Sequence, residues 1–311
     1  MKKGSLKTIA SITILAVTVV LFVRYLQTHP AYLAQLAATS PWWIVGILVA
    51  DFAMIAALTM LSLVLIKMTG KNIGAIENWL LTIYSSIANF FGPLQSGPGV
   101  RAAYLKAKHR VSLRSYFLVT LFAYAAYAIL SAFLLVVGTR PWWQAVLACI
   151  AAAAVSAFVI RLAARRRTQA LRALSIKPIY VAALIGFTAL QLTCIGIRYY
   201  LALRASGSDV SLGQLVSYTG AANFSLFVSI TPDGIGIREA FLLFAQNIHH
   251  VSADDIVSAN LIDRASYVVF LGMLFLIALG FHAKERIAPL ASSTARHADN
   301  TSANATQQRK S

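Results

Sequence analysis

Long apolar runs separated by short polar stretches make up most of this chain. A helix needs about 20 predominantly apolar residues to cross the hydrocarbon core of a membrane. Runs of suitable length lie near residues 8–27, 42–66, 113–138, 142–161, 178–203 and 257–282. Two shorter runs, 76–91 and 211–231, each end in a break rich in glycine and proline. The pattern predicts an all-α polytopic membrane protein with about six full spans and two shorter helical segments.

The two breaks belong to a repeated sequence motif. Residues 97–105, GPGVRAAYL, match residues 234–242, GIGIREAFL, and five of the nine positions are identical. Each copy follows an Asn-Phe pair and precedes a Val-Ser pair, and a tyrosine lies 16 residues after each of these valines. The repeat elements run over 76–138 and 211–282. A repeat built around such breaks in a membrane protein is typical of a transporter substrate site.

The distribution of lysine and arginine predicts how these segments cross the membrane, because cytoplasmic loops carry an excess of basic residues. If run 76–91 crossed completely, the basic stretches 106–114 and 161–177 would both lie outside. If it dips in and returns, both lie inside, and the returning limb 100–110 would be about 16 Å long, roughly half a bilayer. Three further crossings then bring run 211–231 in from the opposite face.

The two segments are therefore expected to be re-entrant hairpins in an inverted repeat, the arrangement associated with alternating access. The N-terminal lysines followed by an apolar run are interpreted as an uncleaved first helix rather than a signal peptide. The N- and C-termini are both expected in the cytoplasm. A single transmembrane domain is predicted over 1–283, followed by a polar tail, 284–311, whose composition predicts disorder.

Composition agrees with a membrane protein and narrows its partners. The chain is 59% hydrophobic and 12% charged, with a mean hydropathy of +0.71 and a net charge of +17. The basic excess is attributed to cytoplasmic loops rather than to nucleic-acid binding. Cys149 and Cys194 both lie in apolar runs, and no Cys/His spacing suits a metal. We expect no cofactor and no disulfide framework.

The breaks supply the candidate binding site. Non-helical backbone at membrane depth survives only where it is buried in protein or lines a wet cavity. Each break leads into a returning half-helix whose N-terminal N–H groups and dipole favour an anion. Arg101 and Arg238 lie on the first turns of these half-helices, and a planar guanidinium suits bidentate binding of phosphate. The other candidates in or before the breaks are Asn89, Gly97, Gly99, Asn223, Gly234 and Gly236.

The glycines would let the backbone approach a ligand closely. The alternative is that they only form tight turns, and that the two arginines snorkel or pair with acids.

Acidic residues inside the apolar runs are further candidates. Asp51 lies near the centre of the second span, where it could pair with Arg101, carry a proton, bind a cationic head group, or be a buried protonated acid. Asp263 and Arg264 are neighbours on one helix and do not face each other, so each is expected to pair elsewhere. Glu239 adds negative charge to the second hairpin. The positions that match Glu239 and Asp263 in the first repeat are Ala102 and Ala123.

These motifs resemble the membrane domain of the lysylphosphatidylglycerol synthase/flippase family. The resemblance rests on Asn89 with residues 97–105 and 111–113, and on residues 231–240 with 251–252 and 263–264. It covers roughly residues 8–283. It implies a lipid flippase or lipid-handling protein of the bacterial plasma membrane. Bifunctional members carry an extra soluble domain that transfers an amino acid from aminoacyl-tRNA to phosphatidylglycerol. No stretch of these 311 residues is expected to form such a domain, so the resemblance is to a flippase-only member.

The chain also departs from the family pattern. Many relatives have an acid after the first glycine of the motif and an acid–arginine pair in the following span. Here those positions are Pro98 and Ala123-Tyr124. Equivalence of substrate therefore does not follow from the resemblance.

The leading prediction is a non-enzymatic membrane protein that translocates or binds an anionic phospholipid or lipid-linked head group. One alternative is a membrane-embedded enzyme that modifies a lipid head group, although no nucleophile–base pair stands out. Another is an accessory membrane protein that binds lipid without transporting it. The expected partners are the lipid and the membrane, without nucleic acid, and a homo-oligomer is compatible with the sequence.

Overall fold

The protein is all-helical in the part of the chain that its computed structural model describes. The described residues are 37–92, 96–165, 168–227, 234 and 236–308, with isolated positions between 20 and 34; side chains are described as far as Phe281, except at 165 and 168. The chain forms two compact units, Met1–Leu271 and Gly272–Ser311. The predicted first span near 8–27 lies outside the described residues, apart from isolated positions.

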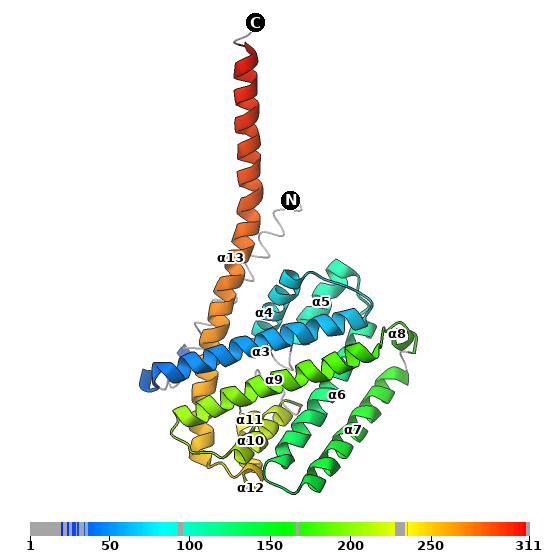
Figure 1. Cartoon of the computed structure of the whole chain (residues 1–311), viewed down its shortest axis with the longest axis vertical. Coiled ribbons are helices and arrows are strands. Elements are labelled where there is room, and N and C mark those ends of the chain that lie inside the picture. Colours follow the sequence, from blue (N-terminus) through cyan, green and yellow to red (C-terminus); the bar gives the residue numbers. More distant parts are fainter. Residues whose placement is uncertain are drawn as a thin grey trace. The chain divides into compact units, whose positions relative to one another are not determined.

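Five helices have the length and apolar composition to cross a membrane, as expected of a polytopic protein (Figure 1). They are α3 (Pro41–Met68), α6 (Leu113–Val137), α7 (Trp142–Arg165), α9 (Pro178–Ala205) and the segment Ala253–Phe281 of α13 (Ala253–Gln308). A short helix, α8 (Thr168–Arg172), lies between α7 and α9. Both α3 and α9 begin with a proline, whose fixed φ suits the first turn of a helix. These helices coincide with five of the six predicted spans.

The two shorter segments form helical hairpins. In each hairpin a hydrogen bond joins the beginning of the first arm to the end of the second arm. The first pairs α4 (Ala75–Phe91) with α5 (Gly97–His109). Glu77 on α4 accepts a hydrogen bond of 2.6 Å from the Tyr104 hydroxyl on α5. The second hairpin contains α10 (Leu212–Phe224), η1 (Ser225–Phe227), α11 (Ile237–Phe244) and α12 (Gln246–His249). Gln214 Nε2 on α10 donates to the His250 carbonyl at 2.9 Å, so this hairpin also begins and ends at one place.

The hairpins open towards opposite ends of the helix bundle (Figure 1). The first follows directly from the end of α3, where the Ser175 N–H donates to the Met68 carbonyl at 2.8 Å and joins the α8–α9 connection to that end. The second contacts the α6–α7 loop, where Arg140 Nη2 donates to the Asn247 carbonyl at 2.9 Å. Because α6 runs from one end to the other, the two openings are separated by its length. This is the arrangement that an inverted repeat predicts.

The sequence repeat is also a repeat of backbone conformation. Arg110 and His250, which follow the two hairpins, adopt left-handed conformations with φ of 56° and 57°. Such a residue ends a helix. In the Val-Ser pairs that follow, 111–112 and 251–252, each valine is buried and each serine hydroxyl accepts a hydrogen bond from the N–H three residues later. The serine therefore caps the next long helix.

The two ends of the bundle differ in their side chains. At the end where the second hairpin opens, the exposed Trp42 and Trp142 lie at the starts of α3 and α7, each beside a second tryptophan. Tryptophan is enriched where a membrane meets water. The end where the first hairpin opens carries a set of basic residues, namely Lys67, Lys106, Lys108, Arg110, Arg114, Arg161, Arg172 and Lys177.

Two features describe the C-terminal segment. The compact units divide at Leu271, and the predicted end of the transmembrane domain at residue 283 stays a prediction. The helix α13 continues to Gln308 through the segment that composition predicts to be disordered. Frequent alanines there favour helix, although Pro289 removes one backbone donor.

Candidate functional site

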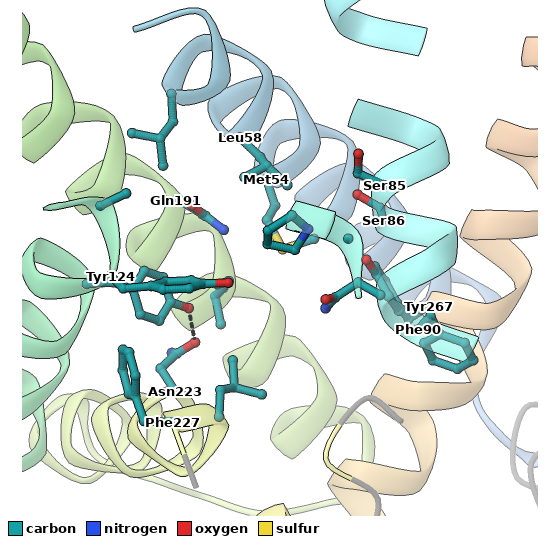
Figure 2. A pocket seen from close by; sticks show the side chains of 18 of the residues that line it. Met54, Leu58, Ser85, Ser86, Phe90, Tyr124, Gln191, Asn223, Phe227 and Tyr267 are labelled. Carbon is teal, nitrogen blue, oxygen red and sulfur yellow. Dashed lines mark hydrogen bonds between the residues drawn. The ribbon is translucent and has the colours of Figure 1, made fainter. Parts of the chain in front are cut away.

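A central cavity of about 250 Å³ lies where the two hairpins meet. The first hairpin contributes Asn89, Gly97 and Arg101 to its lining, and the second contributes Asn223 and Arg238. Long helices α3, α6 and α9 and the first part of α13 complete the wall (Figure 2). The structure therefore brings residues 137 positions apart in the sequence into one site, as the repeat predicts.

The lining combines apolar and hydrogen-bonding groups. Met54 and Leu58 of α3 form one apolar side, and Ser85 and Gln191 add polar atoms (Figure 2). The tyrosines that line the cavity are Tyr116, Tyr124, Tyr127, Tyr199 and Tyr267. A tyrosine offers a broad apolar ring and a hydroxyl that seeks a partner. Such a lining suits a ligand that carries several hydrogen-bonding groups.

A buried ion network crosses one side of the cavity. Arg198 on α9 contacts Asp263 through two nitrogens, with Nε–Oδ1 at 2.7 Å and Nη2–Oδ2 at 3.3 Å. Its Nη1 contacts Asp51 Oδ1 at 2.9 Å, and the Asp51 side chain is fully buried. Of the roles considered for Asp51, ion pairing is the one observed, with Arg198 as the partner in place of Arg101. No motif marks Arg198, and its only sequence signal is an arginine inside an apolar run, which is a site candidate by default.

Arg238 is part of the same network. Its Nη2 contacts Asp263 Oδ2 at 3.2 Å and donates to Asn260 Oδ1 at 3.1 Å. Its Nη1 donates to the Tyr199 hydroxyl at 3.3 Å. The guanidinium of this motif arginine is therefore engaged by protein groups.

The adjacent residues Asp263 and Arg264 pair with different partners, as their helical spacing predicts. Arg264 Nη2 lies 2.7 Å from Glu239 Oε1 on α11. The other oxygen of Glu239 accepts a hydrogen bond of 2.8 Å from the Gly236 N–H, which caps the start of α11. Glu239 therefore joins α11 to α13 rather than standing free for a ligand.

Arg101, the matching arginine of the first hairpin, has a different environment. Its side chain is buried, yet within the described residues its one hydrogen bond to a side chain is a weak 3.5 Å contact from Nη2 to Thr82 Oγ1. Its Nε has no hydrogen-bond partner, and no acid in the described part of the chain forms an ion pair with it. Four arginines around the cavity face three carboxylates in this part of the chain, and the excess positive charge lies on Arg101. A buried cation without an anion is costly, so the two motif arginines are not equivalent.

The four motif glycines have different roles. A Cβ on Gly97 would lie 2.5 Å from the Ser85 carbonyl of α4, so this glycine lets the two arms of the hairpin touch. Gly234 and Gly236 have φ of 70° and 80°, in the left-handed region that favours glycine. A Cβ on Gly99 would meet no atom within 4 Å. Among the described residues that line the cavity, Gly97 is the one motif glycine present.

A cluster around Glu77 closes the open end of the first hairpin. Glu77 Oε1 contacts His109 Nε2 at 2.6 Å and Lys108 Nζ at 2.9 Å, in addition to Tyr104. Partial burial raises the pKa of Glu77, but hydrogen bonds from Tyr104, His109 and Lys108 outweigh it and lower the pKa to about 2. The cluster therefore joins the two arms through a carboxylate that stays ionised at neutral pH.

Comparison with known proteins identifies the family of the chain. The sequence profile described as the lysylphosphatidylglycerol synthase TM region matches residues 8–274, which include both hairpins and the cavity. A search of curated proteins found no match. Because the profile covers most of the chain, the protein belongs to the family of the lysylphosphatidylglycerol synthase transmembrane region.

Proposed function

We propose that this protein binds the phosphate of an anionic lipid head group in the central cavity and moves the lipid between the two leaflets. One observation carries the proposal. Arg101 is buried in the cavity and forms no ion pair with an acid of the described residues. Asp51, Asp263 and Glu239 all pair with other arginines. A phosphate would supply the missing negative charge and accept several guanidinium hydrogen bonds.

The arrangement of the hairpins supports transport. They open towards opposite ends of the bundle and meet at the cavity, so small movements of each could expose the site to one side at a time. The basic end fits the cytoplasm under the positive-inside rule, and the tryptophan-bearing end fits the outer interface. We place the protein in the bacterial plasma membrane, with the first hairpin entering from the cytoplasm.

The size of the cavity fits a head group rather than a whole lipid. Pockets that bury entire small ligands typically measure about 300–1,000 Å³, and this one measures about 250 Å³. The acyl chains would remain in the bilayer. Transport is favoured over head-group chemistry because the three carboxylates around the cavity are engaged by arginines and are poorly placed to act as general bases.

The test uses purified protein in phosphatidylcholine vesicles that contain a fluorescent phosphatidylglycerol. Movement between leaflets is followed by the fraction of fluorescence that a membrane-impermeant reductant can quench. We expect protein-containing vesicles to lose more fluorescence than empty ones, with the lipid recovered unchanged by mass spectrometry. A modified lipid would support the enzymatic alternative, and neither movement nor modification would support a lipid-binding accessory protein.

A further inference from the structure

A second hollow lies on the other face of α9. It is an apolar groove of about 730 Å³ between α6, α9 and α10. Leu134 of α6, Leu192 and Ile197 of α9 and Val216 of α10 are among its lining residues. Helix α9 separates it from the central cavity, because Ile195, Arg198 and Tyr199 face the cavity. We call this hollow the α9–α10 groove.

One charged residue, Arg204, lines the groove within the described part of the chain. It lies one residue before the end of α9, at the end of the bundle that carries the exposed tryptophans. Its Nε donates to the Tyr200 hydroxyl at 3.2 Å, and its guanidinium carbon lies 5.4 Å from the centre of the Tyr200 ring. Tyr200 therefore holds the arginine against the groove.

The acid that pairs with Arg204 does not saturate it. Asp209 contacts Nη1, but the Asp209 side chain is 88% exposed. Ion pairs in water contribute little. A guanidinium has five N–H groups, and the two contacts described leave others that can reach an incoming anion.

The dimensions of the groove match a lipid. The stretch of α9 from Ala189 to Arg204 lines it, and the 15 helical rises between these two residues span about 22 Å. That length exceeds the thickness of one leaflet, which is about half of a hydrocarbon core of about 30 Å. Apolar walls at membrane depth that end in a cation at the interface are complementary to an acyl chain with a phosphate at its head. We propose that the groove binds an anionic glycerophospholipid of the adjacent leaflet, with an acyl chain beside α9 and the phosphate on Arg204.

This second lipid site is independent of the central cavity. Arg204 lies outside the cavity lining, and a lipid in the groove packs against α10, whose residue Asn223 lines the cavity. The bound lipid would therefore support α10 whether or not the protein transports lipid.

The experiment uses the full chain in phosphatidylcholine vesicles that contain a phosphatidylglycerol with a photoreactive diazirine in its acyl chain. Cross-linked peptides are mapped by mass spectrometry. We expect label on the groove residues of α6 and α9 in excess of α7, which exposes many apolar side chains but contributes no residue to this groove. Phosphatidylcholine with the same diazirine should label the groove less.

Variants separate a built site from ordinary lipid contact. Arg204→Gln should lower groove labelling about threefold, since an interfacial ion pair is modest. Asp209→Asn should raise it by removing the competing acid, and Thr193→Phe should remove it by filling the groove. Arg140→Gln, a change at the same end of the bundle but outside the groove, should leave it unchanged. Equal labelling of α7 and α9, or labelling unaffected by Arg204→Gln and Thr193→Phe, would overturn the proposal.

Discussion

Replacing Arg101 by alanine should weaken anion binding without destabilising the protein. In the structure the side chain contributes one weak hydrogen bond of 3.5 Å to Thr82 and no ion pair among the described residues. An arginine at membrane depth costs about 2.5–3.5 kcal/mol on insertion scales. Removing it therefore takes away little favourable energy and relieves an unfavourable term. The thermal unfolding temperature in detergent should stay level or rise.

Lipid binding should respond in the opposite direction. A hydrogen bond to a charged group contributes about 1.5–3 kcal/mol, which corresponds to roughly a 10- to 150-fold loss of affinity when it is removed. The assay is fluorescence anisotropy of a fluorescent phosphatidylglycerol mixed with purified protein in micelles. Arg101→Lys should lose less, because it keeps the charge but not the planar fork. Lys106→Ala, on the exposed face of the same helix, serves as the control and should bind as the wild type does.

Arg238→Ala provides the matched comparison from the second repeat. Here Asp263 and Asn260 each lose a partner at 3.2 and 3.1 Å. Arg198 still pairs with Asp263, so we expect the free energy of unfolding to fall by up to about 3 kcal/mol, below the full cost of breaking a buried pair. Arg101→Ala should therefore lose lipid affinity and keep its stability, whereas Arg238→Ala should lose stability. Wild-type lipid affinity in Arg101→Ala, or a larger loss of stability in Arg101→Ala than in Arg238→Ala, would refute this reasoning.

Further predictions concern the elements around the cavity. Arg198→Ala should lower the free energy of unfolding by about 3–5 kcal/mol, because it removes the cation that Asp51 and Asp263 share. The yield of monodisperse protein should therefore fall sharply. The Glu77 cluster should stabilise the protein above the ordinary carboxyl pKa of 4.5 and lose this effect as pH falls towards the folded-state pKa of about 2; thermal unfolding of Glu77→Gln should lack that acid dependence. Gly97→Ala should cost roughly 1–3 kcal/mol in thermal unfolding through its clash with α4, while Gly99→Ala, which meets no atom within 4 Å, should be tolerated.

The sequence predicted the elements that local physics determines. Five spans follow from hydrophobic length alone, and the two hairpins follow from the balance between short apolar runs and basic loops. A cavity lined by both hairpins also follows from the repeat. The partner of Asp51 could not be predicted this way, because Arg198 lies 147 residues away and the contact depends on how α3 packs against α9.

The inequality of the two motif arginines was less apparent, although the sequence holds a signal for it. The nine-residue motif makes Arg101 and Arg238 look alike, and a motif says nothing about side chains that other helices contribute. The informative position is in the following span. Where the second repeat has Asp263, the first has Ala123. In the second repeat, Asp263 forms an ion pair with Arg238. In the first repeat, which lacks this acid, Arg101 forms no ion pair with an acid of the described residues.

This difference between the repeats leads to a reciprocal prediction for Ala123. Ala123 and Arg101 line the same cavity, and Ala123 matches the position from which Asp263 reaches Arg238. Ala123→Asp should therefore give Arg101 an internal carboxylate and recreate the pairing of the second repeat. Anionic lipid should then bind about as weakly as to Arg101→Ala, while the thermal unfolding temperature is retained.

Ala123→Asn supplies the matched control, because it adds nearly the same volume without the charge. If the added side chain acts by filling the cavity, both variants should lose lipid binding equally. If the charge of Arg101 attracts the lipid, only Ala123→Asp should lose lipid binding. The aspartate variant should also recover binding at acidic pH, where protonation releases Arg101, whereas the asparagine variant should not change with pH. Equal affinities in the two variants at neutral pH would show that a free positive charge on Arg101 is not what holds the lipid.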